Sequence, residues 1–439
     1  MKLFGNLKIR ENELYLGKFS MTELAEKFDT PLYIIDENYF IERCKKYKEK
    51  FKSDKFESHI IYASKALLNL YIAKLVGKQD LHMDAVSGGE LYTIIKAGFN
   101  PEKIYFHGNN KLIQELNFAL DNEIGTIVID NKKEYENLDK LLKEKGKKQR
   151  VLLRINPGID AHTHEYISTS KNDSKFGLSI FDDGTISFIE EISKNQNFDF
   201  AGLHAHIGSQ VFAEDSFFKE ADRVIEYAKK LEERLGIKIE ELNLGGGFGI
   251  YYTEEDSPFK LGKFLESYAE NIEASLEKNK LDVKIISIEP GRSLIANAGH
   301  TLYKACSVKE TYSGKNYIFI DGGMTDNIRP ALYGAKYEAA ITNKMNDKDE
   351  VVYTLAGKCC ESGDVIIKDI KLPKVDDEDL ILVSSTGAYG YSMASNYNRV
   401  EKPAMIAVSD EAKLIVKRET YEDLIRNDIG DVLEWKIYL

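Results

Sequence analysis

Short apolar runs alternate with helical patterns through the first two thirds of the chain. The runs span four to seven residues, which is a usual length for a strand. The segments between them carry apolar residues at the three- and four-residue spacing of an amphipathic helix. We predict strands at residues 59–63, 82–86, 103–106, 126–130, 151–155, 200–206, 240–244 and 284–288. We predict helices at, among others, Gly89–Ala97, Leu112–Leu120, Glu134–Glu144, Phe217–Leu235 and Leu261–Lys278.

Eight strands separated by helices predict a parallel α/β fold, because a crossover is the usual link between parallel strands. Two architectures share this pattern, an open doubly wound sheet and a closed (β/α)8 barrel. Eight units in roughly 250 residues match the usual length of a barrel better. We therefore predict a TIM-like (β/α)8 barrel over residues 36–300.

The pattern changes after about residue 300, where short alternating runs separated by turn residues replace the helical periodicity. The N-terminal 35 residues also contain short alternating pieces, with a polar helix near Met21–Phe28. We predict a C-terminal all-β domain, sandwich-like or barrel-like, that joins residues 1–35 to residues 301–439. Its strands are expected at Tyr317–Ile320, Val351–Leu355, Val365–Ile370, Leu380–Val383, Met405–Val408 and Leu414–Lys417.

Composition narrows the classes of partner. The formal charge is −12 over 439 residues and no basic tract offsets it, which argues against nucleic acid. No apolar run approaches the ~20 residues that span a bilayer, and the N-terminus lacks the apolar core of a signal peptide. We therefore expect a cytoplasmic protein without a membrane partner. Four irregularly spaced cysteines favour the same reducing compartment: Cys44, Cys306, Cys359 and Cys360.

One lysine lies at the junction of the first predicted strand and a helical pattern. The apolar run Ile60–Tyr62 leads to Lys65, and the helical pattern follows at once. We therefore expect Lys65 at the C-terminal end of a strand, just before a helix. Burial and nearby cations lower the pKa of a lysine and free its amine to form a Schiff base with a carbonyl compound. A solvated lysine that flanks a strand fits this stretch as well.

Polar residues and glycines follow most of the predicted barrel strands. The C-terminal strand ends of a (β/α)8 barrel carry its active site, so these residues would meet at one rim. One of them alone carries little weight, but a rim full of them predicts an active site. The groups are Lys65, Asp84–Glu90, His107–Asn110, Arg154–Gly158, His204–Ser209, Gly245–Gly249 and Glu289–Arg292.

Three of these groups suggest particular chemistry. The glycine run Gly245–Gly249 lets backbone amides approach an anion, and a helix N-terminus there would add its dipole. Its place matches a common phosphate site of such barrels, although a tight turn explains it equally well. Glu289 could keep a pyridine nitrogen protonated, which makes the ring an electron sink; a structural pair with Arg292 is the alternative. His204 could stack on a flat ring or be a satisfied core histidine.

Two His-x-His pairs also raise the question of zinc. Alternate residues of a strand point the same way, so such a pair can offer two ligands. His162 and His164 lie in a polar loop, and only His204 and His206 lie on a predicted strand. The adjacent cysteines near residue 360 lack the matching second pair of a zinc motif. We predict no metal.

Several of these stretches form longer motifs: Tyr62–Ala66, Asp84–Glu90, Gly202–Gln210, Leu242–Gly249, Glu289–Arg292 and Asp321–Met324. In these motifs the chain resembles the fold-type III pyridoxal-phosphate decarboxylases. Within that group it is similar to the diaminopimelate decarboxylases. The narrower resemblance rests on Arg154–Thr163, Asp173–Gly177, Asp326–Tyr333, Cys360–Asp364 and Gly387–Asn398. Together the motifs extend over residues 32–403.

The resemblance implies pyridoxal 5'-phosphate as cofactor and the decarboxylation of meso-diaminopimelate to L-lysine, the last step of lysine biosynthesis. It implies that Lys65 bonds the cofactor and that Cys360, reaching in from the partner subunit of a homodimer, is the proton donor. The other implied cofactor-binding residues are Asp84, His204, Ser209, Gly246, Gly247, Glu289, Gly291, Arg292 and Tyr389. The implied substrate-binding residues are Arg292, Arg329, Tyr333, Glu361 and Tyr389.

The implied substrate carries an amine and a carboxylate at each end. A distal site therefore needs guanidinium groups for the carboxylate, which Arg292 and Arg329 supply, and an acid for the ammonium, which Glu361 supplies. An enzyme acting on ornithine would leave both arginines surplus, and alanine racemases of this barrel type place an arginine against the pyridine nitrogen. Related decarboxylases of carboxynorspermidine or a basic amino acid remain the alternative. A regulator without catalytic activity would be expected to lack Lys65 or Cys360.

Overall fold

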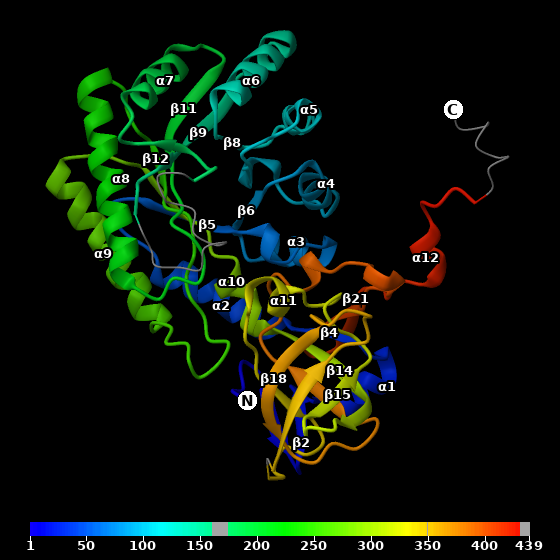
Figure 1. The fold of residues 1–439 in the computed structure, drawn as a ribbon. Helices are drawn as coiled ribbons and strands as arrows, with labels where there is room; N and C mark the ends of the chain where they lie inside the picture. The colour runs from blue at the N-terminus through cyan, green and yellow to red at the C-terminus, as the bar shows by residue number, and fades with distance from the viewer. Residues whose placement is uncertain (160–173, 349, 431–439) are drawn as a thin grey trace. The chain divides into compact units, whose positions relative to one another are not determined.

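The computed structural model describes residues 1–159, 174–348 and 350–430 (Figure 1). The chain forms two compact units. One unit consists of residues 40–296, and the other combines residues 1–39 with residues 297–439. In the described part of the chain, no helix has both the length and the apolar character needed to cross a bilayer.

The unit of residues 40–296 is a closed barrel of eight parallel strands, as the described residues define it. The strands are β5 (Glu57–Tyr62), β6 (His82–Ala85), β7 (Ile104–Phe106), β8 (Thr126–Ile129), β9 (Gln149–Asn156), β11 (Phe198–His204), β12 (Glu241–Asn243) and β13 (Ile285–Ile288). Each pairs with the next in this order, and β13 pairs with β5, which closes the ring. The predicted barrel is confirmed and the open sheet is excluded. A two-residue strand, β10 (Leu178–Ser179), pairs with the end of β9.

Helices connect the strands and lie outside the ring (Figure 1). They are α2 (Glu37–Lys50), α3 (Leu70–Lys78), α4 (Gly88–Lys96), α5 (Ile113–Asp121), α6 (Lys132–Lys145), α7 (Asp183–Lys194), α8 (Glu214–Leu235), α9 (Leu261–Asn279) and α10 (Arg292–Ile295). Four of them begin at a capping side chain. Asn69, Ser87 and Asn131 each accept the backbone N–H three residues on, and Asp182 accepts that of Gly184. Such a cap stabilises a helix by about 1 kcal/mol and lets it start close to a strand end.

Apolar side chains fill the inside of the barrel. Ile61, Tyr105, Val128, Leu152 and Ala201 form one buried cluster, although each belongs to a different strand. Residues of five strands in a closed ring can meet in this way only in its interior. The barrel is therefore a packed core, and a ligand has to bind at its rim.

The second unit is built mostly of sheet, as predicted. Its larger sheet runs in the order β18, β17, β15, β14, β4, β20 and β21, with β16 and β19 attached through β14. The strands are β4 (Leu32–Asp36), β14 (Gly299–Glu310), β15 (Asn316–Ile320), β16 (Ala339–Ile341), β17 (Val351–Ala356), β18 (Val365–Leu372), β19 (Leu380–Val383), β20 (Ala404–Val408) and β21 (Ala412–Val416). All six predicted strands are confirmed. The N-terminal part enters this sheet through β4, which lies between β14 and β20.

Smaller elements complete the second unit. A separate three-stranded sheet contains β1 (Leu7–Arg10), β2 (Glu13–Leu16) and β3 (Phe19–Ser20), and the predicted helix α1 (Met21–Phe28) follows it. The helices α11 (Arg329–Tyr333) and α12 (Tyr421–Ile425) are short. Leucines of the small sheet pack against apolar residues of β4, β14, β19 and β20 in one core cluster.

A buried ion pair stands behind the rim of the barrel. The side chain of Lys111 is fully buried, and its Nζ donates to Oε1 of Glu134 at 2.7 Å. The same ammonium donates to the carbonyl oxygens of Gly108 at 2.8 Å and Val128 at 2.6 Å. Lys111 thus ties the turn after β7 to β8 and to helix α6.

We expect Lys111→Ala to destabilise the protein strongly, because it leaves the Glu134 carboxylate buried without its cation. The free energy of unfolding, measured by urea denaturation, should fall by about 3–5 kcal/mol. The matched control is Lys140→Ala, since the side chain of Lys140 is 78% exposed and should contribute less than about 0.5 kcal/mol. A loss no larger than that of the control would contradict the stabilising role of the pair.

Candidate active site

Lys65 lies beyond the end of the first barrel strand. β5 ends at Tyr62, residues Ser64–Ala66 form a 3-10 turn, and α3 begins only at Leu70. The prediction that Lys65 directly joins strand to helix is therefore wrong in detail, because Asn69 caps the helix and delays its start. The side chain of Lys65 is exposed. Its amine is thus presented at the C-terminal end of the strands.

Asp84, the third residue of β6, holds the turn that carries Lys65. Its Oδ1 accepts the backbone N–H of Ser64 at 2.7 Å, and the side chain is buried. Burial raises the pKa of Asp84, while the nearby Lys65 ammonium lowers it in part. The end of β13 supports the same turn, since Ala63 N donates to Pro290 O at 3.2 Å. A side chain at Gly291 would meet Cβ of Ala63 at 2.7 Å.

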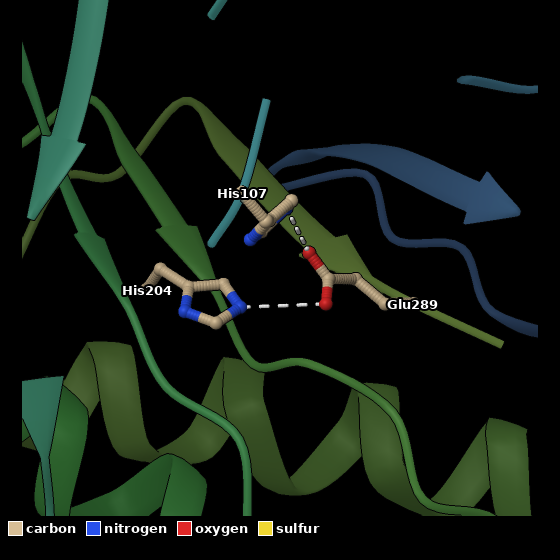
Figure 2. A group of neighbouring side chains, drawn as sticks. All are labelled: His107, His204 and Glu289. Atoms are coloured by element: carbon tan, nitrogen blue, oxygen red, sulfur yellow. Dashed lines mark hydrogen bonds and ion pairs between the residues drawn. The ribbon is translucent and has the colours of Figure 1, made fainter. Parts of the chain in front are cut away.

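Glu289 is the centre of a buried polar cluster at the strand ends. Its Oε1 lies 3.0 Å from Nε2 of His107 and accepts a hydrogen bond of 2.8 Å from the amide of Asn243. Its Oε2 lies 3.3 Å from Nε2 of His204 (Figure 2). His107 follows β7, Asn243 ends β12 and His204 ends β11. Since Glu289 itself follows β13, four strand ends converge on one carboxylate.

The charge state of this cluster is set by burial and by the two histidines. Burial opposes ionisation of Glu289, but His107 and His204 outweigh it and hold the pKa of the carboxyl well below its usual range. Burial lowers the pKa of His204 to about 4, so its ring is neutral near pH 7. A neutral imidazole has a single N–H. Contact with the carboxylate assigns that proton to Nε2, and Nδ1 is a buried acceptor without a partner among the described residues.

A second cluster combines the glycine run with a guanidinium group. Arg292 donates from Nη2 to Oγ of Ser209 at 2.9 Å and from Nη1 to the hydroxyl of Tyr252 at 2.7 Å. The glycine run packs backbone against backbone, since a Cβ on Gly247 would meet the carbonyl oxygen of Gly208 at 2.3 Å. The expected helix N-terminus after the run is wrong, because Phe248 forms a strand bridge and α9 begins only at Leu261.

Arg329 and Tyr333 lie on one short helix, α11, of the second unit. Arg329 is buried, and its Nη1 donates to the hydroxyl of Tyr337, whose ring also lies 5.6 Å below the guanidinium carbon. Tyr333 is half-buried. The arginine is therefore held in place by the aromatic ring.

Cys360, Glu361 and Tyr389 lie in loops of the same unit. Cys360 and Glu361 are exposed between β17 and β18, and the backbone N–H of Cys360 donates to Oδ1 of Asn398 at 2.8 Å. Tyr389 is half-buried and has a φ of +59°. Residues other than glycine adopt such a φ only at a cost of about 1–3 kcal/mol. Such backbone strain persists at functional sites more often than elsewhere.

Some of the residues quoted above lie outside the described part of the chain. They are His162 and His164 of the first His-x-His pair, and residues 160–163 and Asp173 of the quoted motifs. In the second pair, only His204 lies on β11; His206 follows the strand and accepts the N–H of Gly246 at 3.1 Å. Within the described residues, donor atoms of His107, His204 and Glu289 come within 4.8 Å of one another, close enough for a metal ion.

His107, Asn243 and Tyr252 were missing from the predicted site residues. His107 was among the predicted rim groups but was given no role. Asn243 places a polar side chain within an apolar strand, which is a signal of function. Tyr252 carried no such signal, because aromatic residues are frequent in cores. Its contact with Arg292 depends on how the loop after β12 folds.

The family model described as "Pyridoxal-dependent decarboxylase, pyridoxal binding domain" matches residues 37–296. The chain belongs to the pyridoxal-dependent decarboxylases. The match spans the barrel unit and more than half of the chain, and it includes every rim residue of the two clusters.

Curated relatives and solved structures extend this family likeness over the second unit. Diaminopimelate decarboxylase of Bacillus subtilis (strain 168) is 46% identical over 424 residues, covering 96% of this chain and 97% of the relative. A crystal structure of diaminopimelate decarboxylase from M. jannaschii in complex with L-lysine is 35% identical, covers 97% of this chain and 98% of that chain, and superposes with a TM-score of 0.90. The Helicobacter pylori enzyme complexed with L-lysine is 34% identical, covers 92% and 98%, and has a TM-score of 0.85. Within its family, the chain belongs with the diaminopimelate decarboxylases.

The neutral, buried His204 predicts a pH dependence of stability. Its pKa is about 4 in the folded protein and ~6.5 when unfolded, so the unfolded chain takes up a proton first as the pH falls. Stability without added ligand should therefore decrease between about pH 6.5 and pH 4. The slope of the unfolding free energy against pH, measured by urea denaturation, reports the number of protons taken up on unfolding. Between pH 7 and pH 5, His204→Phe should lower this number by up to about one.

His300→Phe is the comparison variant, because His300 lies in the second unit and burial also lowers its pKa to about 4. We expect a similar reduction of the slope there. An unchanged slope in His204→Phe, with a reduced slope in His300→Phe, would contradict a neutral His204.

Proposed function

We propose that the protein decarboxylates meso-diaminopimelate to L-lysine and carbon dioxide, with pyridoxal 5'-phosphate as cofactor. The proposal is carried by one observation. The turn that carries Lys65 and the buried, ionised Glu289 both follow strands at the same rim of a barrel whose family binds pyridoxal. Support comes from relatives named diaminopimelate decarboxylase that match nearly the whole chain. Solved structures of that name hold L-lysine, the product.

The barrel residues fit this cofactor. The glycine run has no room for side chains, since a Cβ on Gly246 would lie 2.1 Å from the carbonyl oxygen of Glu289. Such a backbone surface, with the guanidinium of Arg292 and the hydroxyl of Ser209 beside it, suits a phosphate. The buried Nδ1 of His204 has no hydrogen-bond partner among the described residues. The anionic Glu289 suits the protonated nitrogen of a pyridine ring.

Each residue of the barrel would then have one task. Lys65 Nζ would bond the aldehyde carbon, whose oxygen would leave as water, and Asp84 would hold the turn that presents the amine. Oε2 of Glu289 would accept the N–H of the ring, and His204 would lie against its face. When bound, pyridoxal phosphate supplies an electron-withdrawing ring that takes up the electron pair left by the departing carboxylate.

The second unit would bind the end of the substrate that does not react. The buried Arg329, braced by Tyr337, offers a guanidinium for the distal carboxylate, together with Arg292 of the barrel. Glu361 offers an anion for the distal ammonium, and Tyr333 and Tyr389 would contact the substrate. These groups match a substrate that is charged at both ends.

Cys360 would donate a proton from Sγ to the carbon that lost its carboxylate. We place it in the site of the partner subunit of a homodimer, and its exposed side chain is free to reach there. The neighbouring Cys359 is less suited to be the proton donor. Burial and Asp364 raise the pKa of its thiol to about 11, and its side chain is buried. All four cysteines carry free thiols, which fits the cytoplasm as compartment.

Purified protein with pyridoxal 5'-phosphate should release carbon dioxide and L-lysine from meso-diaminopimelate. Lys65→Ala should abolish both the turnover and the visible absorbance that accompanies covalent capture of the cofactor, because the bonding amine is gone. Lys74→Ala, on the adjacent helix α3, is the control and should keep both. L-lysine and L-ornithine are assayed in parallel. Turnover of either in preference to meso-diaminopimelate would refute the substrate assignment, and covalent capture by Lys65→Ala would refute the role of Lys65.

Cys360→Ala should bind cofactor and substrate but turn over at least tenfold more slowly, because a general acid typically contributes 10²–10⁴-fold (roughly) to a rate. Cys359→Ala is the matched control and should lose far less. Single-turnover kinetics with cofactor-loaded protein measure both rates. An equal loss of turnover rate in the two variants would show that Cys360 is not the proton donor.

A further inference from the structure

The amide of Asn243 is fixed in one orientation. Its Oδ1 accepts the backbone N–H of Gly245 at 2.9 Å, so its Nδ2 must be the atom that faces Glu289. That Nδ2 donates to Oε1 at 2.8 Å. One oxygen of the Glu289 carboxylate therefore has a donor that cannot rotate away.

His107 approaches the same oxygen from a rigid position. Its backbone N–H donates to the carbonyl oxygen of Ala85 at 2.8 Å, and the next residue, Gly108, has a φ of +123°. The Gly108 carbonyl is in turn bound by the buried ammonium of Lys111 at 2.8 Å. The side chain of His107 is buried, and its Nε2 lies 3.0 Å from Oε1 of Glu289, at ion-pair distance. The angle of this contact does not make it a hydrogen bond, so Nε2 is a buried donor without a hydrogen-bond partner among the described residues.

The two oxygens of Glu289 are thus unequally occupied. Oε1 has Asn243 at 2.8 Å and His107 at 3.0 Å, while Oε2 has the longer contact of 3.3 Å with His204 (Figure 2). The rings of His107 and His204 lie edge to face with centroids 4.7 Å apart, so His107 also limits where His204 can turn. Oε2 is the oxygen left for a further donor.

We propose that His107 is a positioning residue: its Nε2 lies 3.0 Å from Oε1 of Glu289, close enough to donate its N–H after a small turn of the ring, and this contact directs Oε2 toward the ring nitrogen of the cofactor. The proposal rests on the proposed function of the site, and it adds a second donor to a carboxylate that must stay ionised where water is scarce. Asn243 is neutral and fixes the direction of its hydrogen bond, whereas His107 lies at ion-pair distance from the same oxygen. His107 acts through Glu289 and does not itself react.

Other titratable groups face Glu289 from the elements packed around it. They are Asp84 of β6, Arg154 of β9, His206 after β11 and Glu220 of α8. All of them remain in the variants described next. A change in pH dependence on substitution of His107 alone therefore reports the contact between His107 and Glu289.

Two substitutions separate donation from packing. His107→Phe keeps a flat ring of similar size but has no N–H, while His107→Gln keeps a donor but has no ring. We expect His107→Phe to lower kcat by roughly 10- to 100-fold, as loss of a partner that orients a functional group does, with little change in KM. The acidic limb of the kcat profile should move to higher pH, because Glu289 loses a donor that keeps its pKa low. His107→Gln should recover most of the rate and restore the limb.

The readout that does not depend on turnover is binding of pyridoxal 5'-phosphate, followed by its visible absorbance from pH 5 to pH 9. His107→Phe should weaken binding and shift the pH dependence of the absorbance, and His107→Gln should shift it less. His82→Phe is the matched control, since His82 begins β6 at the other end of the strands and stacks on His59 at 4.0 Å. It should bind cofactor as the wild type does.

The outcomes separate this proposal from the proposed function. A wild-type protein that binds the cofactor but does not decarboxylate meso-diaminopimelate would sink the substrate assignment, while the absorbance of the His107 variants would still decide the positioning role. His107→Phe with wild-type binding, kcat and pH profile would overturn the positioning role alone. Equal losses in His107→Phe and His107→Gln, with normal thermal unfolding of both, would overturn it as well.

Discussion

A carboxylate that is buried at a barrel rim remains charged only where hydrogen-bond donors replace its lost water. Glu289 follows β13, receives hydrogen bonds from residues at the ends of β11 and β12, and lies at ion-pair distance from His107 after β7. Four separate strands must therefore be brought into one ring before the charge is stable. Closure of the barrel by β8–β9 and β13–β5 pairing achieves this, so the fold and the ionised acid depend on each other.

Rigid supports stand behind the groups at the rim. Asp84 holds the turn of Lys65 by its backbone, Gly245 orients Asn243, and the buried pair of Lys111 and Glu134 anchors the turn that follows His107. These supports are backbone contacts or buried ion pairs, which do not have to reorganise when a ligand enters. Preorganised groups of this kind stabilise developing charge more effectively than solvent does.

The second unit holds its residues in the same manner. Tyr337 holds Arg329, Asn398 holds the backbone of Cys360, and Asp364 accepts the N–H of Cys359 at 2.8 Å. The residues with proposed roles at the substrate therefore sit on a scaffold of their own. Division of the chain into two compact units separates groups proposed to contact the cofactor from most of those proposed for the distal end of the substrate.

The sequence alone determined the repeating pattern of the barrel, most strands of the larger sheet of the second unit and the rim groups, because periodicity and strand-end composition are local properties. It did not predict β14, whose apolar residues are mixed with His300, Lys304 and Cys306 and whose two halves pair with different strands. It placed Lys65 too close to the helix, since the cap at Asn69 competes with simple periodicity. Only the tertiary structure revealed His107 and Asn243 as partners of Glu289, because residues 107, 243 and 289 meet through ring closure, which no local pattern encodes.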